Sequence, residues 1–153
     1  MKKTKKNATF AVQKKNVMPE KVNKEKDDQI EKANRYVDNA KVYIANACYD
    51  KDLKHYTDSK YVKTAGSTLW KGCLIALDAV FGVKKGKGRP SIEKYEEEAG
   101  KRDKKLLIDI SDGYNIIHLS MGYDGIKDKE ICDKGFRLAE AIIKRCATMY
   151  NKA

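Results

Sequence analysis

The residues best placed to do chemistry lie in 106–125, LLIDISDGYNIIHLSMGYDG, a segment that contains His118. These twenty residues hold no Lys or Arg, although Lys and Arg make up 33 of the 153 residues. A histidine such as His118 can act as a proton acceptor. At 100° per residue, Ser111 and Asn115 fall on the same side of a helix as His118, which predicts a polar cluster. The simpler alternative is that His118 hydrogen-bonds Ser111 or a neighbouring helix.

Metal, nucleophile and cofactor chemistry have less support in the sequence. Neither His118 nor His55, the second histidine, has a carboxylate or cysteine at ligand spacing, so we expect no metal site. The sequence has no nucleophile elbow and no dinucleotide fingerprint, so we expect no cofactor. The four cysteines form no CxxC pair and are expected to be free thiols that mostly fill the core: Cys48, Cys73, Cys132 and Cys146.

Positive charge is concentrated near the start of the chain. Residues 1–26 hold nine lysines against two glutamates, so they carry +7 of a net charge of +11. Their weak periodicity predicts a basic flexible arm, either solubilising or phosphate-binding, before a domain at residues 27–153. A second basic segment, residues 82–90 (GVKKGKGRP), is either a solvated connector or a nucleic-acid contact. Its charges are Lys84, Lys85, Lys87 and Arg89.

Apolar residues at helical spacing predict an all-α fold, an antiparallel four-helix bundle with one short extra helix. The length is that of a single domain. No apolar run approaches the roughly 18 residues of a membrane span, and the start lacks a secretory signal, so we expect a cytoplasmic protein without membrane contact. The expected helices run from Pro19 or Asp27 to Cys48, from Asp58 or Ser59 to Gly82, and over residues 91–99, 106–121 and 128–150.

The segment 106–121 fits both the period of a helix and the pattern of a β-hairpin. Asp112-Gly113 is a hairpin signal, but a lone hairpin in a helical chain would be marginal, so we favour a helix. This helix is apolar on a second side, which we expect to form a homodimer face. The residues of that face are Ile108, Ile116 and Leu119.

The order of elements resembles the HEPN superfamily of bacterial helical proteins, often nucleases or toxin partners, and more closely a group of uncharacterised bacterial proteins related to it. The resemblance covers about residues 30–150 and rests on TAGSTLWKGCLIALDAVFG, the basic segment and YNIIHLSMGYDG. It implies a dimer whose cleft is lined by a helix on which four to six residues separate an Arg from the His that follows it. His118 matches that histidine and Asn115 is polar, but Ser111, Asp112 and Gly113 stand where the arginine is sought.

Three hypotheses about function follow. RNA cleavage needs a proton acceptor and a cation near the developing phosphorane charge, which Asp112 would repel. The first hypothesis is therefore a catalytically silent HEPN-like dimer that binds RNA or a protein partner. The second is an active ribonuclease or toxin that uses His118 with an unconventional cation, Lys84 or Arg102, brought across the dimer. The third is a purely structural interaction bundle.

Overall fold

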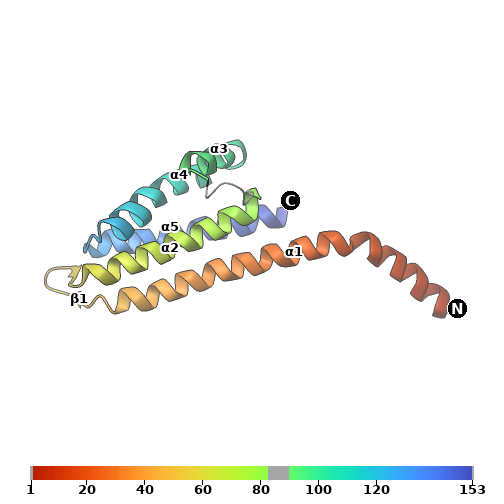
Figure 1. The fold of residues 1–153 in the computed structure, drawn as a ribbon, viewed down its shortest axis with the longest axis horizontal. Coiled ribbons are helices and arrows are strands. Elements are labelled where there is room, and N and C mark those ends of the chain that lie inside the picture. Colours follow the sequence, from red (N-terminus) through yellow and green to blue (C-terminus); the bar gives the residue numbers. More distant parts are fainter. Residues whose placement is uncertain (1, 83–89, 153) are drawn as a thin grey trace.

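The computed structural model describes the backbone of residues 2–82 and 90–152, and the side chains of residues 24–82 and 90–150. This part of the chain is mostly helical, as the sequence predicts (Figure 1). Its elements are α1 (Lys2–Ala45), β1 (Tyr49–Asp50), β2 (His55–Tyr56), α2 (Ser59–Phe81), α3 (Ile92–Arg102), α4 (Lys104–Gly113), the π-helix η1 (Tyr114–Tyr123) and α5 (Lys129–Lys152).

The longest helix, α1, includes most of the segment expected to be a basic arm. It has 44 residues, and its N-terminal end bends and runs past the rest of the molecule (Figure 1). The backbone of residues 2–26 is thus helical, which the sequence did not predict, because too few apolar residues occur there to mark a face. A separate arm with a boundary at residue 26 stays a prediction.

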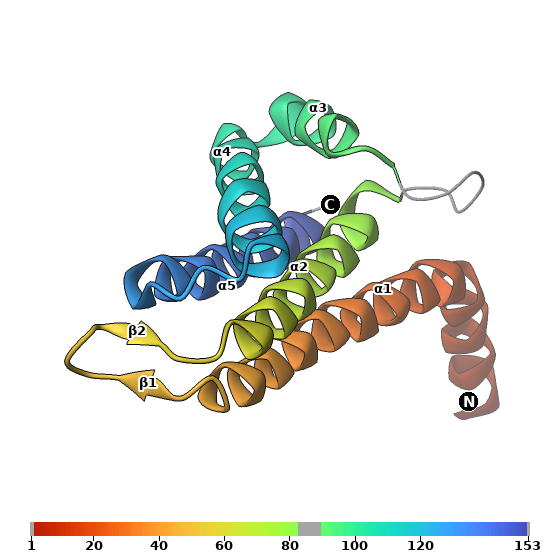
Figure 2. The same ribbon diagram turned by 60° about the vertical axis from the view of Figure 1, so that its left-hand side comes forward.

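The central helix of the fold is α2, which packs against α1, η1 and α5. Figure 2 shows it between α1 and the α4–η1 segment. Both of its ends are as predicted: Asp58 accepts a hydrogen bond from the amide of Lys60 at 3.0 Å, and Gly82 adopts a left-handed conformation with φ 58°. Its buried side chains, Val62, Leu69, Trp70, Cys73 and Leu77 among them, form the middle of the core.

Residues 104–123 form one continuous helical segment, which confirms the helix over the hairpin at Asp112-Gly113. The chain passes from α4 directly into η1, a π-helix that the sequence did not predict. At its end the amide of Asp124 bonds the carbonyl of Leu119, five residues back, at 2.8 Å. Because a π-turn holds more residues than an α-turn, side-chain directions counted at 100° per residue fail beyond Gly113.

A small antiparallel sheet corrects the expectation of a purely helical body. Tyr49 pairs with Tyr56 and Asp50 with His55. The carboxylate of Asp50 accepts hydrogen bonds from the amides of Asp52 and Leu53, and so holds the turn. Strands of two residues are too short to show alternation, which is why the segment reads as a polar connection.

The last helix, α5, forms where the sequence predicts a helix at residues 128–150 and turns small and apolar side chains toward the core. Cys132, Gly135, Leu138, Ile142 and Cys146 are among its buried residues. None of the described helices is long and apolar enough to cross a membrane.

Candidate ligand-binding pocket

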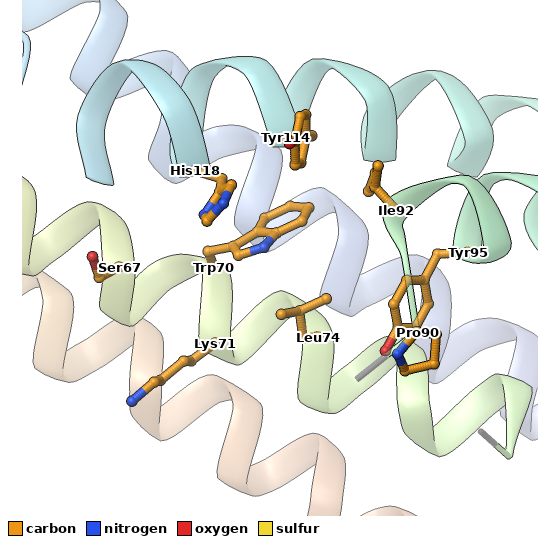
Figure 3. A pocket seen from close by; sticks show the side chains of 9 residues that line it. All are labelled: Ser67, Trp70, Lys71, Leu74, Pro90, Ile92, Tyr95, Tyr114 and His118. Carbon is orange, nitrogen blue, oxygen red and sulfur yellow. The ribbon is translucent and has the colours of Figure 1, made fainter. Parts of the chain in front are cut away.

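The leading candidate site is a pocket between α2, η1 and the start of α3, here called the His118 pocket (Figure 3). Its volume of about 390 Å³ falls within the usual size range of small-ligand sites. Three parts of the chain that are distant in sequence meet there. The lining residues are Ser67, Trp70, Lys71, Leu74, Pro90, Ile92, Tyr95, Tyr114 and His118.

Three flat rings, the aromatic trio of Trp70, Tyr114 and His118, lie together in this pocket. The ring centroids of Trp70 and His118 are 5.7 Å apart with planes tilted by 30°, and those of Tyr114 and His118 are 5.2 Å apart at 37°. Trp70 is only 7% exposed, whereas Tyr114 and His118 are half-buried. The trio therefore combines a fixed ring with two rings that solvent can reach.

The local structure explains how the trio assembles. Trp70 lies in the middle of the central helix, and its ring reaches the junction of α4 and η1, where a Cβ on Gly113 would stand 3.5 Å from it. Tyr114 and His118 are four residues apart in η1, and their rings contact each other. π-helices occur frequently at functional sites.

The charge around the pocket is positive. Lys71 is the only charged residue among the lining side chains that the structure describes, and it is exposed. The nearby carboxylate of Asp78 accepts a hydrogen bond from the hydroxyl of Tyr95. An aromatic pocket with a cation and no carboxylate in its lining suits a flat, neutral or anionic ligand.

Two members of the predicted polar cluster contact each other: the amide of Asn115 donates to the backbone carbonyl of Ser111 at 3.1 Å, and Asn115 is exposed. Among residues 24–82 and 90–150 no group hydrogen-bonds the ring of His118, which instead lies against the rings of Trp70 and Tyr114. The alternative bond from His118 to Ser111 or a neighbouring helix is therefore not formed in this structure. The cluster as a functional site stays a prediction.

The predicted dimer face is only partly exposed within one chain. Ile108 is 53% exposed, whereas Ile116 packs against the core and Leu119 is half-buried. Two apolar side chains elsewhere in the chain, Val42 at 62% and Leu53 at 63%, are more exposed than Ile108. The dimer through this helix stays a prediction.

Of the cations expected from the sequence to take part in binding, the structure describes only Arg102. Lys84, Lys85, Lys87 and Arg89 lie outside the described residues. Arg102 does not line the pocket and instead sits over the ring of Phe81, 5.4 Å from its centre. Lys71 was missed because an exposed lysine on a helix carries no signal of its own in one sequence. Trp70, the one tryptophan of the chain, is part of the core and also lines the pocket.

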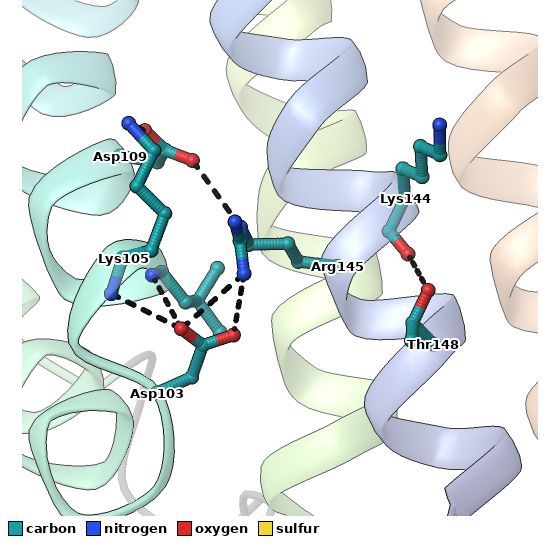
Figure 4. Close-up of polar contacts among 7 residues, drawn as sticks. Asp103, Lys105, Asp109, Lys144, Arg145 and Thr148 are labelled. Carbon is teal, nitrogen blue, oxygen red and sulfur yellow. Dashed lines mark hydrogen bonds and ion pairs between the residues drawn. The ribbon is translucent and has the colours of Figure 1, made fainter.

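A second polar group joins α4 to α5 (Figure 4). Asp103 accepts hydrogen bonds from the amides of Lys105 and Leu106 and pairs with Arg145 at 3.0 Å. Burial opposes ionisation of Asp103, but these hydrogen bonds and the guanidinium outweigh it and lower its pKa. Asp109 is 4% exposed, pairs with Lys105 at 3.2 Å, and keeps one oxygen 3.8 Å from Arg145. The network holds the two helices together, and none of its residues lines the His118 pocket.

No group of three His, Cys, Asp or Glu side chains in the described part of the chain is arranged to hold a metal ion.

Comparisons with known proteins place the chain among proteins of unknown function. A family model described as "Domain of unknown function (DUF5618)" matches residues 28–148. A solved structure of a protein of unknown function from Dyadobacter fermentans is 34% identical, with a TM-score of 0.71, and the match covers 84% of this chain and 98% of that one. No curated protein matches. Neither match connects the chain to the HEPN superfamily.

Proposed function

We propose a function for this chain, which belongs to the family described as Domain of unknown function (DUF5618): it binds single-stranded RNA in the His118 pocket without cutting it. The observation that carries the proposal is the aromatic trio in an open pocket whose lining holds a lysine and no carboxylate. Single-stranded RNA is recognised mainly by bases that leave the stack and lie on flat side chains.

The energy of such contacts is sufficient for binding. Stacking of one base on an aromatic side chain contributes about 1–3 kcal/mol. Trp70 loses little freedom when a base lies against it, because the core already holds its ring. The ammonium of Lys71 adds attraction to a phosphate, which makes binding sensitive to salt.

The same surroundings argue against catalysis. A catalytic histidine needs the reacting proton within about 2.6–3.2 Å and a group that stabilises the developing charge. His118 instead lies against the rings of Trp70 and Tyr114, and Arg102 is engaged with Phe81. We therefore propose binding without cleavage and favour the silent module over the active nuclease.

The proposal keeps the finer expectations that accompany the HEPN resemblance. These are an antiparallel four-helix bundle and a homodimer that forms through α4 and η1. Two exposed apolar side chains on this segment, Ile108 at 53% and Tyr123 at 76%, support the dimer. The basic residues at 1–26 and 82–90 are proposed to strengthen RNA binding by charge, and the location is proposed to be the cytoplasm.

The test is the binding of a fluorescent 12-nucleotide single-stranded RNA, followed by anisotropy. Tyr114→Ala should weaken binding by about 5-fold to 150-fold, the equivalent of one lost stacking contact. His118→Ala should weaken it less, and His118→Phe should bind almost normally, because a phenyl ring keeps the stacking surface. His55→Ala, which changes the histidine of the hairpin, is the control and should bind like the wild type.

The same samples decide between the three hypotheses. Intact RNA after hours of incubation is expected with every variant. Cleavage that disappears in both His118→Ala and His118→Phe would overturn the silent module in favour of the nuclease. The absence of any RNA binding would favour the third hypothesis, a purely structural interaction bundle.

A further inference from the structure

We infer that the RNA-binding surface continues from the His118 pocket across the outer face of α2 to α1. There a second hollow holds the backbone of the adjoining nucleotides. This inference rests on the proposed function and names the path of the strand beyond the first base. It places the phosphates of a single strand against Lys71, Arg35 and Lys32, in that order from the pocket.

The second hollow, here called the α1–α2 groove, lies between those two helices and has a volume of about 650 Å³. It is lined from α1 by two cations, two tyrosines, Asp38 and Asn39, and from α2 by Thr68 and Lys71. The α1 residues that the inference uses are Lys32, Arg35, Tyr36 and Tyr43.

The pocket and the groove are connected through Lys71, which lines both. Ser67 lines the pocket and its sequence neighbour Thr68 lines the groove, so only a narrow part of the α2 surface separates the two hollows. Figure 3 shows the side chain of Lys71 extending from α2 toward α1, away from the ring of Trp70. Its ammonium is therefore positioned to contact the phosphate that joins a base in the pocket to the next nucleotide.

The groove has the charge that a phosphodiester backbone requires. Three cations and a single carboxylate, that of Asp38, line it. Lys32 and Arg35 are exposed, and neither forms an ion pair within residues 24–82 and 90–150. Elsewhere on the same helix Lys41 is paired with Glu140 at 3.1 Å. The groove thus keeps cations that are available to an anionic ligand.

The groove also offers surfaces for bases. Tyr36 and Tyr43 are seven residues apart on α1, which is two helical turns or about 10 Å along one face. Tyr36 is held against the centre of α2, because its Cβ is 3.1 Å from where a Cβ on Gly72 would stand. A cationic groove with aromatic rings at intervals is the arrangement by which proteins hold single-stranded nucleic acid without strict sequence preference.

The experiment compares a short and a long probe: adenosine 5′-monophosphate, observed by ligand-detected NMR, and a 12-nucleotide single-stranded RNA, observed by anisotropy. The double variant Lys32→Ala/Arg35→Ala should bind the mononucleotide like the wild type. Its affinity for the 12-mer should fall at least fivefold at low salt. The slope of log affinity against log salt should shrink by about 1.4, or 0.7 for each of two lost phosphate contacts.

The matched control is Lys60→Ala/Arg137→Ala, which removes the same charges from two exposed side chains outside both hollows. Its affinity for the 12-mer should stay closer to that of the wild type than the affinity of Lys32→Ala/Arg35→Ala does. Lys71→Ala, at the shared position, should weaken both probes. Circular dichroism of each variant should match that of the wild type.

The results separate failure of the path from failure of the proposed function. If Tyr114→Ala weakens the 12-mer but the groove variant behaves like its charge control, the path over α2 is wrong and the pocket stands. If the wild type binds neither probe, the proposed function fails as well. A polyglutamate peptide that binds the groove as tightly as the RNA would assign the groove to an acidic protein segment and overturn the inference.

Discussion

None of the side chains in the pocket indicates a function by itself, and the proposed binding role depends on how they are arranged. His118 lies 5.7 Å from the ring of Trp70 and 5.2 Å from that of Tyr114, measured between centroids. Neither neighbour is an acid or a cation, so the imidazole contributes its flat surface more than its proton. A base in the pocket would lie against the outer faces of rings that already contact one another.

The cysteines give a prediction at the residue scale. Burial raises the pKa of Cys132 and Cys146 to about 12 and that of Cys73 further still, whereas Cys48 is exposed. Only the thiolate attacks a disulfide reagent. At neutral pH, Ellman's reagent should therefore titrate one thiol per native chain and four after unfolding in guanidinium.

A Cys48→Ser variant is the control and should show almost no reaction while folded. Rapid reaction of two or more thiols in the native wild type would contradict the described core.

Residue-level reasoning from the sequence found part of the site. His118 can be singled out from one sequence because it is a rare residue in a segment without Lys or Arg. Trp70 and Tyr114 cannot, because their contact with His118 depends on the packing of α2 against η1. Lys71 carries no sequence signal either, because its importance comes from the crossing of two helices and not from its neighbours in sequence.

At the scale of elements, the crossing of α2 and η1 depends on small residues. A Cβ on Gly66 would stand 2.6 Å from the Cβ of Met121 and 2.8 Å from the Cα of Gly122. Gly66→Ala should therefore push the helices apart and lower the free energy of unfolding by about 1–3 kcal/mol. Denaturant unfolding followed by circular dichroism measures the change.

The matched substitution is Gly100→Ala in α3, where the nearest atom to the new methyl group is a Leu107 carbon at an ordinary 3.5 Å. It should leave the stability unchanged or raise it by up to about 1 kcal/mol, because alanine is the better helix former. Equal effects of the two substitutions would show that α2 and η1 do not approach as closely as described.

The elements themselves could largely be predicted. The cap at Asp58, the left-handed Gly82 and the apolar spacing of α5 are local signals, and each was read correctly. The π-helix and the hairpin were missed for different reasons. The π-helix keeps a helical composition while changing its hydrogen bonds, and strands of two residues are too short for a pattern. The π-helix matters for the site because it carries both Tyr114 and His118.

At the scale of the whole molecule, the proposed homodimer is tested at Ile108. This side chain is 53% exposed in one chain, so Ile108→Lys should leave the fold intact. If the face is buried between two copies, the lysine would place an unpaired cation in an apolar contact, at a cost of several kcal/mol. Light scattering should then show a dimer for the wild type and a monomer for the variant.

Leu53→Lys in the hairpin changes an apolar residue that is 63% exposed, somewhat more than Ile108, and should remain dimeric. A wild type that is monomeric at tens of micromolar, or a dimer untouched by Ile108→Lys, would remove α4 and η1 as the interface.

The central claim is that RNA lies on the aromatic trio, and ultraviolet cross-linking tests it most directly. The full chain is irradiated with a single-stranded RNA 12-mer, and the modified residues are mapped by mass spectrometry. The account predicts adducts at Trp70 or Tyr114, with a second group at Tyr36 or Tyr43 and intact RNA. Adducts confined to the lysine-rich residues 1–26, with none in η1 or at Trp70, would contradict it.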